Sequence, residues 1–483
     1  MLFSTPEFIF YFLPLCLIFF YVTPNQYKKH VLILFSMVFY SIWSWKYFLL
    51  LVLSIAFNYS IGLKILKSKH SLKKLILVSG VSFNLLLLAY FKYYNFFLEN
   101  INNILSLELN LKSIILPLAI SFYTFQQIAF LLDCNKQKIK NISFIDYFFF
   151  ITFFPQLIAG PIVHHQEIIP NVKNIKVNFS TLSYGLSYFA LGMFKKLIIA
   201  DTMAEYADPI FLTFSRGNTV GFFSAWIGIL SYSFQIYFDF SGYSDMAIGL
   251  GKIFNLDLPI NFNSPYKSVN IIEFWRRWHI TLSRFLRDYL YIPLGGNRKG
   301  NTKRYLNLFI TMLLGGLWHG SSWNFVIWGA LHGVYLFLCH FFRILNIRVT
   351  KLISIPSTFI AVMFAWIFFR SINFNASIEF IKSLIGLNGF TVINKYLFLQ
   401  KIFDFIQPGA SSLIMRGNTQ ILNIILAAII CFYAPNTQEI MQNIQNKKHF
   451  WNFNLASALV ISIILAIAIL NMNQVNEFIY FQF

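Results

Sequence analysis

Histidines stand inside apolar stretches of this 483-residue chain, where ionisable side chains are costly and by default mark a functional site. His319 ends the apolar run in "TMLLGGLWHG", and His332 follows thirteen residues later in "GALHG". His279 stands in "RRWHITLS". An imidazole titrates near physiological pH and can take a proton from a hydroxyl as that hydroxyl attacks an activated carbonyl. These residues predict histidine base chemistry within a membrane.

Each histidine also has a structural interpretation. A membrane histidine can hydrogen-bond one helix to another, and His279 falls near the border of an amphipathic pattern. The small residues Gly315, Gly316 and Gly320 leave space for a ligand or for another backbone. Two His-Gly settings separated by a tight "GSS" turn favour a functional role, more strongly for His319 than for His332.

A dense group of charges occupies "EFWRRWHITLSRFLRDYL" at 273–290. At about 100° per residue this stretch predicts one amphipathic helix. Its charged arc holds Glu273, Arg276, Arg277, Arg284, Arg287 and Asp288, and its opposite arc holds Phe274, Trp278, Phe285 and Tyr289. The i,i+4 pairs Glu273–Arg277 and Arg284–Asp288 are expected to neutralise each other. Such a helix could plug a polar cavity. It could also bind anionic lipid at the interface, but that leaves Glu273, Asp288 and His279 unexplained.

Two carboxylates interrupt another apolar segment. Asp239 and Asp245 lie in "FQIYFDFSGYSDMAIGLGKIF" at 234–254. Paired buried charges are more often scaffold than catalyst, so a structural role with an Arg or hydroxyl partner is the first interpretation. A supporting place in a polar tunnel is the second.

Several chemistries are excluded by missing motifs. The chain has no GxSxG, GxxxxGK[ST], HExxH, CxxC or HxxxxD pattern. Its four cysteines are scattered without metal spacing, so no metal site is expected and they are interpreted as small packing residues. The formal charge of +20 does not predict nucleic acid binding, because excess Lys and Arg in a membrane protein gather in cytoplasmic loops.

The elements that position these residues are membrane helices. The chain is 57% hydrophobic and 12% charged, where soluble proteins carry about 25% charged residues. Apolar stretches, each near the roughly 20 residues that a span needs, predict an all-α polytopic membrane protein with about ten to twelve helical elements, some of them re-entrant or interfacial. They run at roughly 8–24, 31–44, 47–66, 75–97, 113–132, 178–200, 219–250, 305–318, 322–345, 352–370, 420–437 and 454–472.

Basic residues predict the orientation. Lysines at 28–29, 64–74 and 135–140 fall in alternate loops, whereas the loop at 98–112 carries Glu99, Glu108 and a single Lys112. This alternation places the N-terminus outside. The first apolar run lacks a basic n-region and a cleavage pattern, so we expect a retained helix.

A single membrane domain over 1–483 is expected. Residues 1–110 form peripheral helices, and 111–345 form the core that carries the embedded polar residues. Residues 346–475 form C-terminal helices, with an extramembrane excursion near 373–418 that includes one or two interfacial helices. Residues 476–483, "NEFIYFQF", form an aromatic end.

The motifs resemble the bacterial branch of the membrane-bound O-acyltransferase family. The resemblance is carried by "FWRRWHITLSRFLRDYLYIPLGGNRKG" and "LLGGLWHGSSWNFVIWGALHG", with support from "LPLAISFYTFQQIAF" and "FFPQLIAGPIV". It covers roughly residues 110–345 and is similar to membrane proteins of alginate and peptidoglycan O-acetylation, and more distantly of teichoic acid D-alanylation.

The resemblance implies a ring of helices around a transmembrane tunnel in the bacterial inner membrane, where a cytoplasmic thioester donor, expected to be acetyl-CoA, meets an acceptor from the outer side. It assigns His319 as the catalytic histidine and gives His279 a supporting role. His332 matches the pattern without a firm role. The implied partners are an extracytoplasmic acyltransferase of the SGNH type and a polysaccharide or peptidoglycan acceptor.

The chain ends on "FIYFQF", which resembles a C-terminal motif whose tyrosine receives the acyl group in the same family. On this interpretation Tyr480 accepts acetyl with the help of His319 and passes it to the partner. The alternative is an aromatic belt that anchors the last helix at the membrane surface.

Three other functions remain open from the sequence. One is transfer of D-alanyl or another acyl group from a carrier protein. A second, of a different class, is a proton-coupled transporter or flippase, although no internal inverted repeat is visible. A scaffolding membrane subunit is the third.

Overall fold

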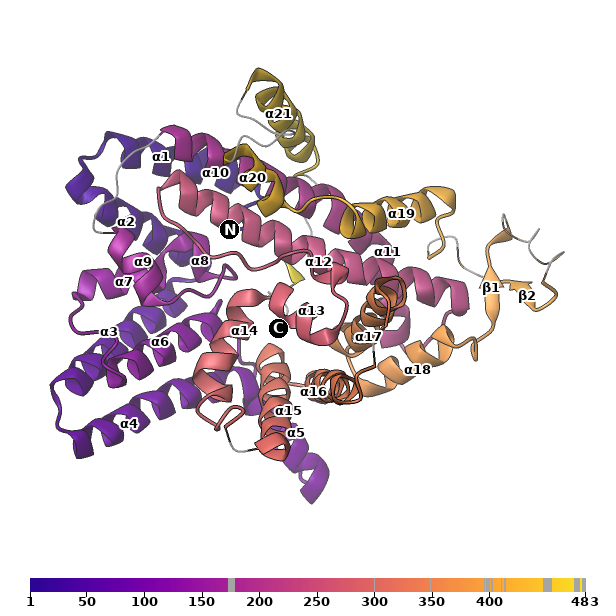
Figure 1. Cartoon of the computed structure of the whole chain (residues 1–483), viewed down its shortest axis with the longest axis horizontal. Coiled ribbons are helices and arrows are strands. Elements are labelled where there is room, and N and C mark those ends of the chain that lie inside the picture. The colour runs from indigo at the N-terminus through magenta and orange to yellow at the C-terminus, as the bar shows by residue number, and fades with distance from the viewer. Residues whose placement is uncertain are drawn as a thin grey trace. The chain divides into compact units, whose positions relative to one another are not determined.

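A computed structural model describes residues 1–172, 179–298, 300–347, 349–394, 396, 400, 403–409, 411, 414–445, 454–472 and 478–479. The chain divides into two compact units. Unit 1 comprises Met1–Gly192 and Tyr243–Ile260, and unit 2 comprises Met193–Gly242 and Asn261–Phe483. The long helix α12 (Phe222–Ile253; Figure 1) contributes to both. The single-domain organisation expected from the sequence stays a prediction.

The regular elements among the described residues of unit 1 are all helical. Its elements, in which η marks a π or 3-10 segment, are η1 (Phe8–Phe12), α1 (Leu13–Val22), η2 (Asn25–Tyr27), α2 (Lys28–Ser41), α3 (Trp45–Lys67), α4 (His70–Leu88), η3 (Ala89–Tyr93), α5 (Tyr94–Leu105), α6 (Ile120–Asn135), α7 (Phe144–Thr152), α8 (Phe154–Leu157), α9 (His165–Val172) and most of α10 (Phe179–Phe194). The loop expected at 98–112 is shorter than predicted, because α5 continues to Leu105.

A buried polar network joins three helices of unit 1. Asn58 on α3 donates from Nδ2 to Asn84 on α4 at 3.2 Å and to Oε1 of Gln127 on α6 at 2.6 Å. Asn84 donates back to Asn58 at 2.6 Å, and Ser54 donates to Gln127 at 2.8 Å. Helices that meet in lipid gain little from hydrophobicity alone, so such reciprocal amide pairs fix how α3, α4 and α6 face one another.

Unit 2 carries the remaining elements. They are η4 (Lys195–Ala200), α11 (Asp201–Ser215), the first part of α12, η5 (Pro265–Lys267), α13 (Ile271–Arg277), α14 (Ile280–Leu286), η6 (Arg287–Tyr291), α15 (Gly300–His319), α16 (Trp323–Ile344), α17 (Lys351–Arg370), α18 (Phe374–Leu384), β1 (Phe390–Val392), β2 (Ile406–Pro408), α19 (Asn418–Phe432), α20 (Thr437–Gln445) and α21 (Leu455–Leu470).

The predicted all-helical membrane class is confirmed. Among the described residues, four helices are long and apolar enough to span a bilayer, namely Trp45–Lys67, Ser71–Leu105, Trp323–Ile344 and Lys351–Arg370. Shorter apolar helices run at Phe8–Val22, Asn418–Phe432 and Leu455–Leu470. The 373–418 excursion contains α18 and, unexpectedly, the short parallel pair β1–β2.

The single amphipathic helix predicted over 273–290 is wrong. α13 ends at Arg277, Trp278 is extended, and His279 adopts φ +42° and ψ +53° before α14 begins. The segment at 261–263 explains why the helix breaks at Trp278 and His279. The Asn263 N–H donates to the Arg277 carbonyl, and the Ile280 N–H donates to the Asn261 carbonyl, each at 2.9 Å. These bonds replace helical i→i−4 pairs with partners from elsewhere in the chain, which periodicity cannot detect.

Glycines let α15 and α16 approach closely across the "GSS" turn. A Cβ on Gly329 would lie 2.5 Å from the Met312 carbonyl oxygen, and one on Gly316 would collide with the Phe325 carbonyl. Gly316 therefore makes room for another backbone, one of the two possibilities open from the sequence. This close approach places the C-terminal end of α15, and with it His319, against α16.

Candidate functional site

His279 is buried at the break between α13 and α14, with its ring held by Asn261. The Nδ1 atom of His279 lies 3.1 Å from Asn261 Oδ1. The same oxygen accepts from the backbone N–H of Thr281 at 3.3 Å and from its hydroxyl at 2.9 Å. An oxygen that already accepts from Thr281 requires His279 Nδ1 to be the donor. The proton is then on Nδ1, and the lone pair of the imidazole is on Nε2.

His319 is the last residue of α15 and is 3% exposed. Three rings surround its imidazole, with centroid distances of 4.9 Å to Trp318, 5.1 Å to Trp328 and 5.2 Å to Phe369. All three contacts are edge-to-face. Aromatic rings thus line three sides of the imidazole, and a general base needs that imidazole in its neutral form.

His332 is buried on α16, thirteen residues after His319. Its Nδ1 accepts the indole N–H of Trp275 at 3.2 Å. Its ring lies 4.7 Å from that of Trp328 and 5.1 Å from that of Trp275. Because Nδ1 is an acceptor, the imidazole proton is on Nε2, the opposite tautomer to that of His279.

Tryptophans connect the three histidines within unit 2. The Trp328 indole contacts both His319 and His332 edge-to-face. The Trp318 ring lies 6.5 Å from that of His279 and 4.9 Å from that of His319. The structure therefore brings together the three histidines singled out from the sequence, in the order His279, His319, His332.

A buried charge cluster joins η4, α11 and α12. Lys196 Nζ lies 2.9 Å from Asp239 Oδ1 and 2.8 Å from Asp201 Oδ1, and all three side chains are buried. The structural interpretation of Asp239 predicted an Arg or hydroxyl partner, but the partner is a lysine. One buried ammonium group thus lies between two buried carboxyl groups.

The C-terminal segment reaches this cluster. The Ile479 N–H donates to Asp239 Oδ2 at 2.9 Å. The Phe478 ring lies 5.8 Å from that of Phe240, and the Phe240 ring lies 4.8 Å from His279. Tyr480, the predicted acyl acceptor, lies outside the described residues.

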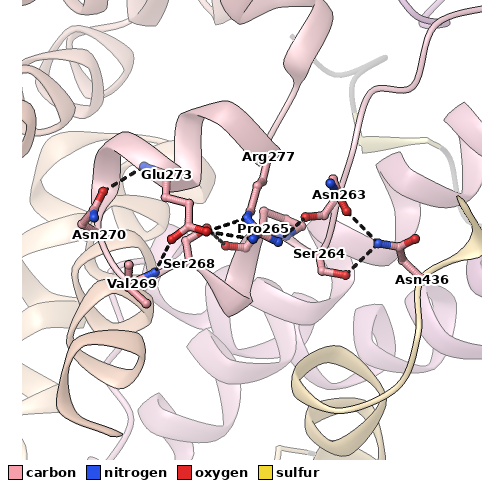
Figure 2. Close-up of polar contacts among 9 residues, drawn as sticks. All are labelled: Asn263, Ser264, Pro265, Ser268, Val269, Asn270, Glu273, Arg277 and Asn436. Atoms are coloured by element: carbon pink, nitrogen blue, oxygen red, sulfur yellow. Dashed lines mark hydrogen bonds and ion pairs between the residues drawn. The ribbon is translucent and has the colours of Figure 1, made fainter. Parts of the chain in front are cut away.

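Glu273 and Arg277 hold the break in place (Figure 2). Glu273 Oε1 accepts from Arg277 Nε at 3.0 Å and Nη2 at 2.8 Å, as the i,i+4 spacing predicted. Its Oε2 accepts the Val269 N–H at 3.0 Å. Arg277 Nη1 also donates to the Asn263 carbonyl at 3.2 Å, and Asn436 binds the Asn263 side chain at 2.8 Å. The pair thus ties α13 to the segment that carries Asn261.

The other charged candidates differ in burial and in the unit to which they belong. Arg276 and Arg287 are exposed, and Asp288 pairs with Arg287 at 2.7 Å. Arg284, whose pairing with Asp288 stays a prediction, is half-buried on α14. Asp245 is buried on the part of α12 that belongs to unit 1.

Sequence reasoning missed Asn261, Lys196 and Trp328. Lys196 carried a usable signal, because a lysine inside the apolar stretch at 178–200 needs a buried carboxylate partner. Asn261 had none, since its contact with His279 joins residues 18 apart across an irregular segment. Trp328 looked like an ordinary apolar residue of a membrane helix.

Comparison with known proteins gives a consistent result. The sequence profile of the membrane-bound O-acyltransferase family matches residues 37–378. The chain is 41% identical, over 100% of its length and 98% of the relative, to the peptidoglycan O-acetyltransferase of Helicobacter pylori. It is 41% identical to the probable alginate O-acetylase AlgI of Pseudomonas aeruginosa, over 77% of this chain and 72% of that relative. The teichoic acid D-alanyltransferase of Bacillus subtilis is 28% identical, over 53% of this chain and 69% of that relative.

The resemblance found from the "LWHG" and "RWHITLS" motifs is thereby confirmed. The family profile matches well over half of the chain, and two relatives exceed 30% identity over most of it. This chain belongs to the membrane-bound O-acyltransferase family and is a multi-pass membrane acyltransferase.

Proposed function

We propose that this protein moves an acetyl group from cytoplasmic acetyl-CoA across the inner membrane for O-acetylation of an envelope polysaccharide. The names of the full-length and alginate relatives support the acetyl group and the polysaccharide class. Peptidoglycan is the first acceptor to test, because the relative so named is similar over the whole chain. Alginate-like exopolysaccharide is the second. The loop lysines support an N-terminus on the outer side.

The proposed chemistry is transfer to Tyr480. His319 takes the phenolic proton as the tyrosine oxygen attacks the thioester carbonyl. A carbon–oxygen bond forms, the carbon–sulfur bond breaks, and His319 returns the proton to the departing thiolate of coenzyme A. Because a phenol with pKa about 10 leaves more readily than an alcohol, the tyrosyl acetate can pass its acetyl group onward. An extracytoplasmic partner acyltransferase then delivers it to a polymer hydroxyl.

One observation supports Tyr480 as the proposed acceptor. Phe478 and Ile479, which directly precede Tyr480, lie on Asp239 and Phe240, and Phe240 touches the ring of His279. An aromatic belt would instead expose the segment to the membrane surface, whereas Phe478 is 1% and Ile479 is 5% exposed. In this scheme His279, with its lone pair on Nε2, orients the acceptor or a water.

Incubation of the purified protein with radiolabelled acetyl-CoA tests the proposal. Label should bind covalently to wild type, and be lost in His319→Ala and in Tyr480→Phe. The matched controls are His340→Ala, a half-buried histidine of α16, and Tyr433→Phe, a tyrosine that is largely exposed. Both controls should keep the label.

The other outcomes each correct one part of the proposal. Label retained by Tyr480→Phe would remove the terminal tyrosine as acceptor. Label bound to His319→Ala would show that His319 is not the base. If wild type takes label only from an acyl carrier protein, the donor is that carrier protein and not acetyl-CoA. This result would favour chemistry of the D-alanyl transfer type.

A further inference from the structure

We propose that Asp239, braced by Lys196, is a positioning residue that sets the register in which Phe478 and Ile479, here called the C-terminal segment, lie on α12. This inference deepens the proposed function, on which its purpose rests, because the segment it holds directly precedes the proposed acceptor Tyr480. The contacts themselves are independent of any acyl transfer.

Two consecutive residues of α12 contact two consecutive residues of the C-terminal segment. Asp239 accepts the backbone N–H of Ile479, and Phe240 packs against the ring of Phe478. A shift of the segment by one residue would break both contacts together, since the ring of Phe478 would leave Phe240 and another N–H would have to meet the carboxylate. The paired contacts therefore select one register.

The charge cluster explains why Asp239 binds the backbone N–H of Ile479. Lys196 binds both Asp201 and Asp239, so one ammonium group serves two buried carboxylates. Hydrogen bonds from N–H groups to a carboxylate are short and strong in such surroundings. The Ile479 N–H supplies one of them, and the free energy of that bond favours the docked segment over a released one.

Phe240 also connects the docked segment to His279. Phe240 contacts Phe478 on one side and His279 on the other, at 5.8 Å and 4.8 Å between ring centroids. A residue that fixes Phe478 and Ile479 on α12 therefore fixes the point from which the chain continues to Tyr480. Positional errors of about 1 Å in a reacting group can cost on the order of 100-fold in rate.

The chain offers a matched control for the test. Asp201 binds the same Nζ atom of Lys196 as Asp239 does, at nearly the same distance. Asp201→Asn and Asp239→Asn each remove one negative charge from the same lysine, but only Asp239 is hydrogen-bonded to Ile479. A difference between the two variants isolates the contact with the segment from the general effect of charge removal.

Hydrogen–deuterium exchange of the full-length protein in detergent measures the docking directly. Fragmentation of the C-terminal peptide reports the Ile479 amide. In Asp239→Asn this amide should exchange faster, on the order of tenfold or more, while in Asp201→Asn it should stay close to wild type. Equal exchange in all three proteins, or equal acceleration in both variants, would overturn the proposal.

A second variant covers the case in which Asp239→Asn does not fold. Phe478→Ala leaves the side chains of the charge cluster unchanged and removes the ring contact with Phe240. It should also accelerate exchange at Ile479, with protection of α16 unchanged. If the Ile479 amide stays protected in Phe478→Ala, the paired register is refuted.

Acetylation assays separate this inference from the proposed function. With register lost, kcat for labelling by acetyl-CoA should fall in Asp239→Asn on the order of tenfold to 100-fold. The KM for acetyl-CoA should stay unchanged, because the proposed role of Asp239 is to position the acceptor and not the donor. Faster exchange at Ile479 with normal labelling would support the contact between Asp239 and Ile479 but refute its role in positioning the acceptor. Lost labelling with normal protection at Ile479 would refute the positioning role of Asp239.

Discussion

Asn261 Oδ1 lies 3.1 Å from His279 Nδ1, and the same oxygen accepts two hydrogen bonds from Thr281. One amide oxygen thus stabilises the break between α13 and α14 and sets the tautomer of the histidine at that break. The arrangement links the backbone geometry of the site to the chemistry that its imidazole can perform.

Asn261→Ala should lower the rate of acyl transfer by roughly 100-fold, because His279 loses the acceptor that keeps its proton on Nδ1. The free energy of unfolding should fall by about 1–3 kcal/mol, since buried donors are left unsatisfied. Labelling rates and detergent melting curves measure the two effects. Asn263→Ala is the control, because its side chain binds Asn436 and not the histidine. Equal loss of activity in both variants would contradict the role of Asn261.

Trp328→Phe should reduce kcat on the order of tenfold, because the indole contacts His319 and His332 and a smaller ring leaves both imidazoles looser. Trp366→Phe is the matched control. Trp366 is fully buried and stacks on Trp328, and its ring lies 6.5 Å from that of His332. In the part of the chain that the structure describes, it makes no ring contact with His319, so it tests the contact with His319. Both variants should lose about 2 kcal/mol of stability. A larger kcat effect in Trp366→Phe would contradict this explanation.

Arg277→Lys should destabilise the protein by about 1 kcal/mol with little change in KM for the donor. Lysine cannot reproduce the two-pronged contact with Glu273 and the bond to the Asn263 carbonyl. Thermal unfolding in detergent measures the loss. Arg287→Lys, which alters an exposed pair with Asp288, should change stability by less than about 0.5 kcal/mol. A large rise in KM in Arg277→Lys would instead indicate direct contact with substrate.

His165 predicts a pH dependence of stability in unit 1. Burial in α9 lowers the pKa of His165 to about 4, and the nearby Asp133 carboxylate, 3.8 Å from Nδ1, opposes this only in part, while His164 and Lys138 lower it further. The unfolded chain, with a histidine pKa of about 6.5, binds a proton that the folded chain does not. The contribution is therefore fully present above about pH 6.5 and is lost as the pH falls toward 4.

Melting temperatures measured from pH 7.5 to 4.5 test this prediction. His165→Gln should decline less steeply with falling pH than wild type, because the group that binds the extra proton in the unfolded chain is gone. His30→Gln replaces an exposed histidine and should follow the wild-type curve. Parallel curves for wild type and His165→Gln would refute the assignment.

Composition and local motifs were sufficient for the class of this protein. Ionisable residues are too costly in lipid to occur by chance, so His319, His279 and Asp239 stood out without any structure. The Glu273–Arg277 pair was also predictable, because an i,i+4 contact depends only on the helix in which both residues lie.

Non-local contacts decided the rest. Periodicity assumed that the helix continues through Trp278 and His279, but hydrogen bonds from the segment at 261–263 end it there. Lys196 pairs with Asp239, which is 43 residues away in the sequence, and Ile479 donates to the same carboxylate from 240 residues away. The sequence alone determined which side chains could do chemistry in a membrane. The tertiary structure determined their tautomers, partners and register, because those depend on hydrogen bonds between segments that no local pattern relates.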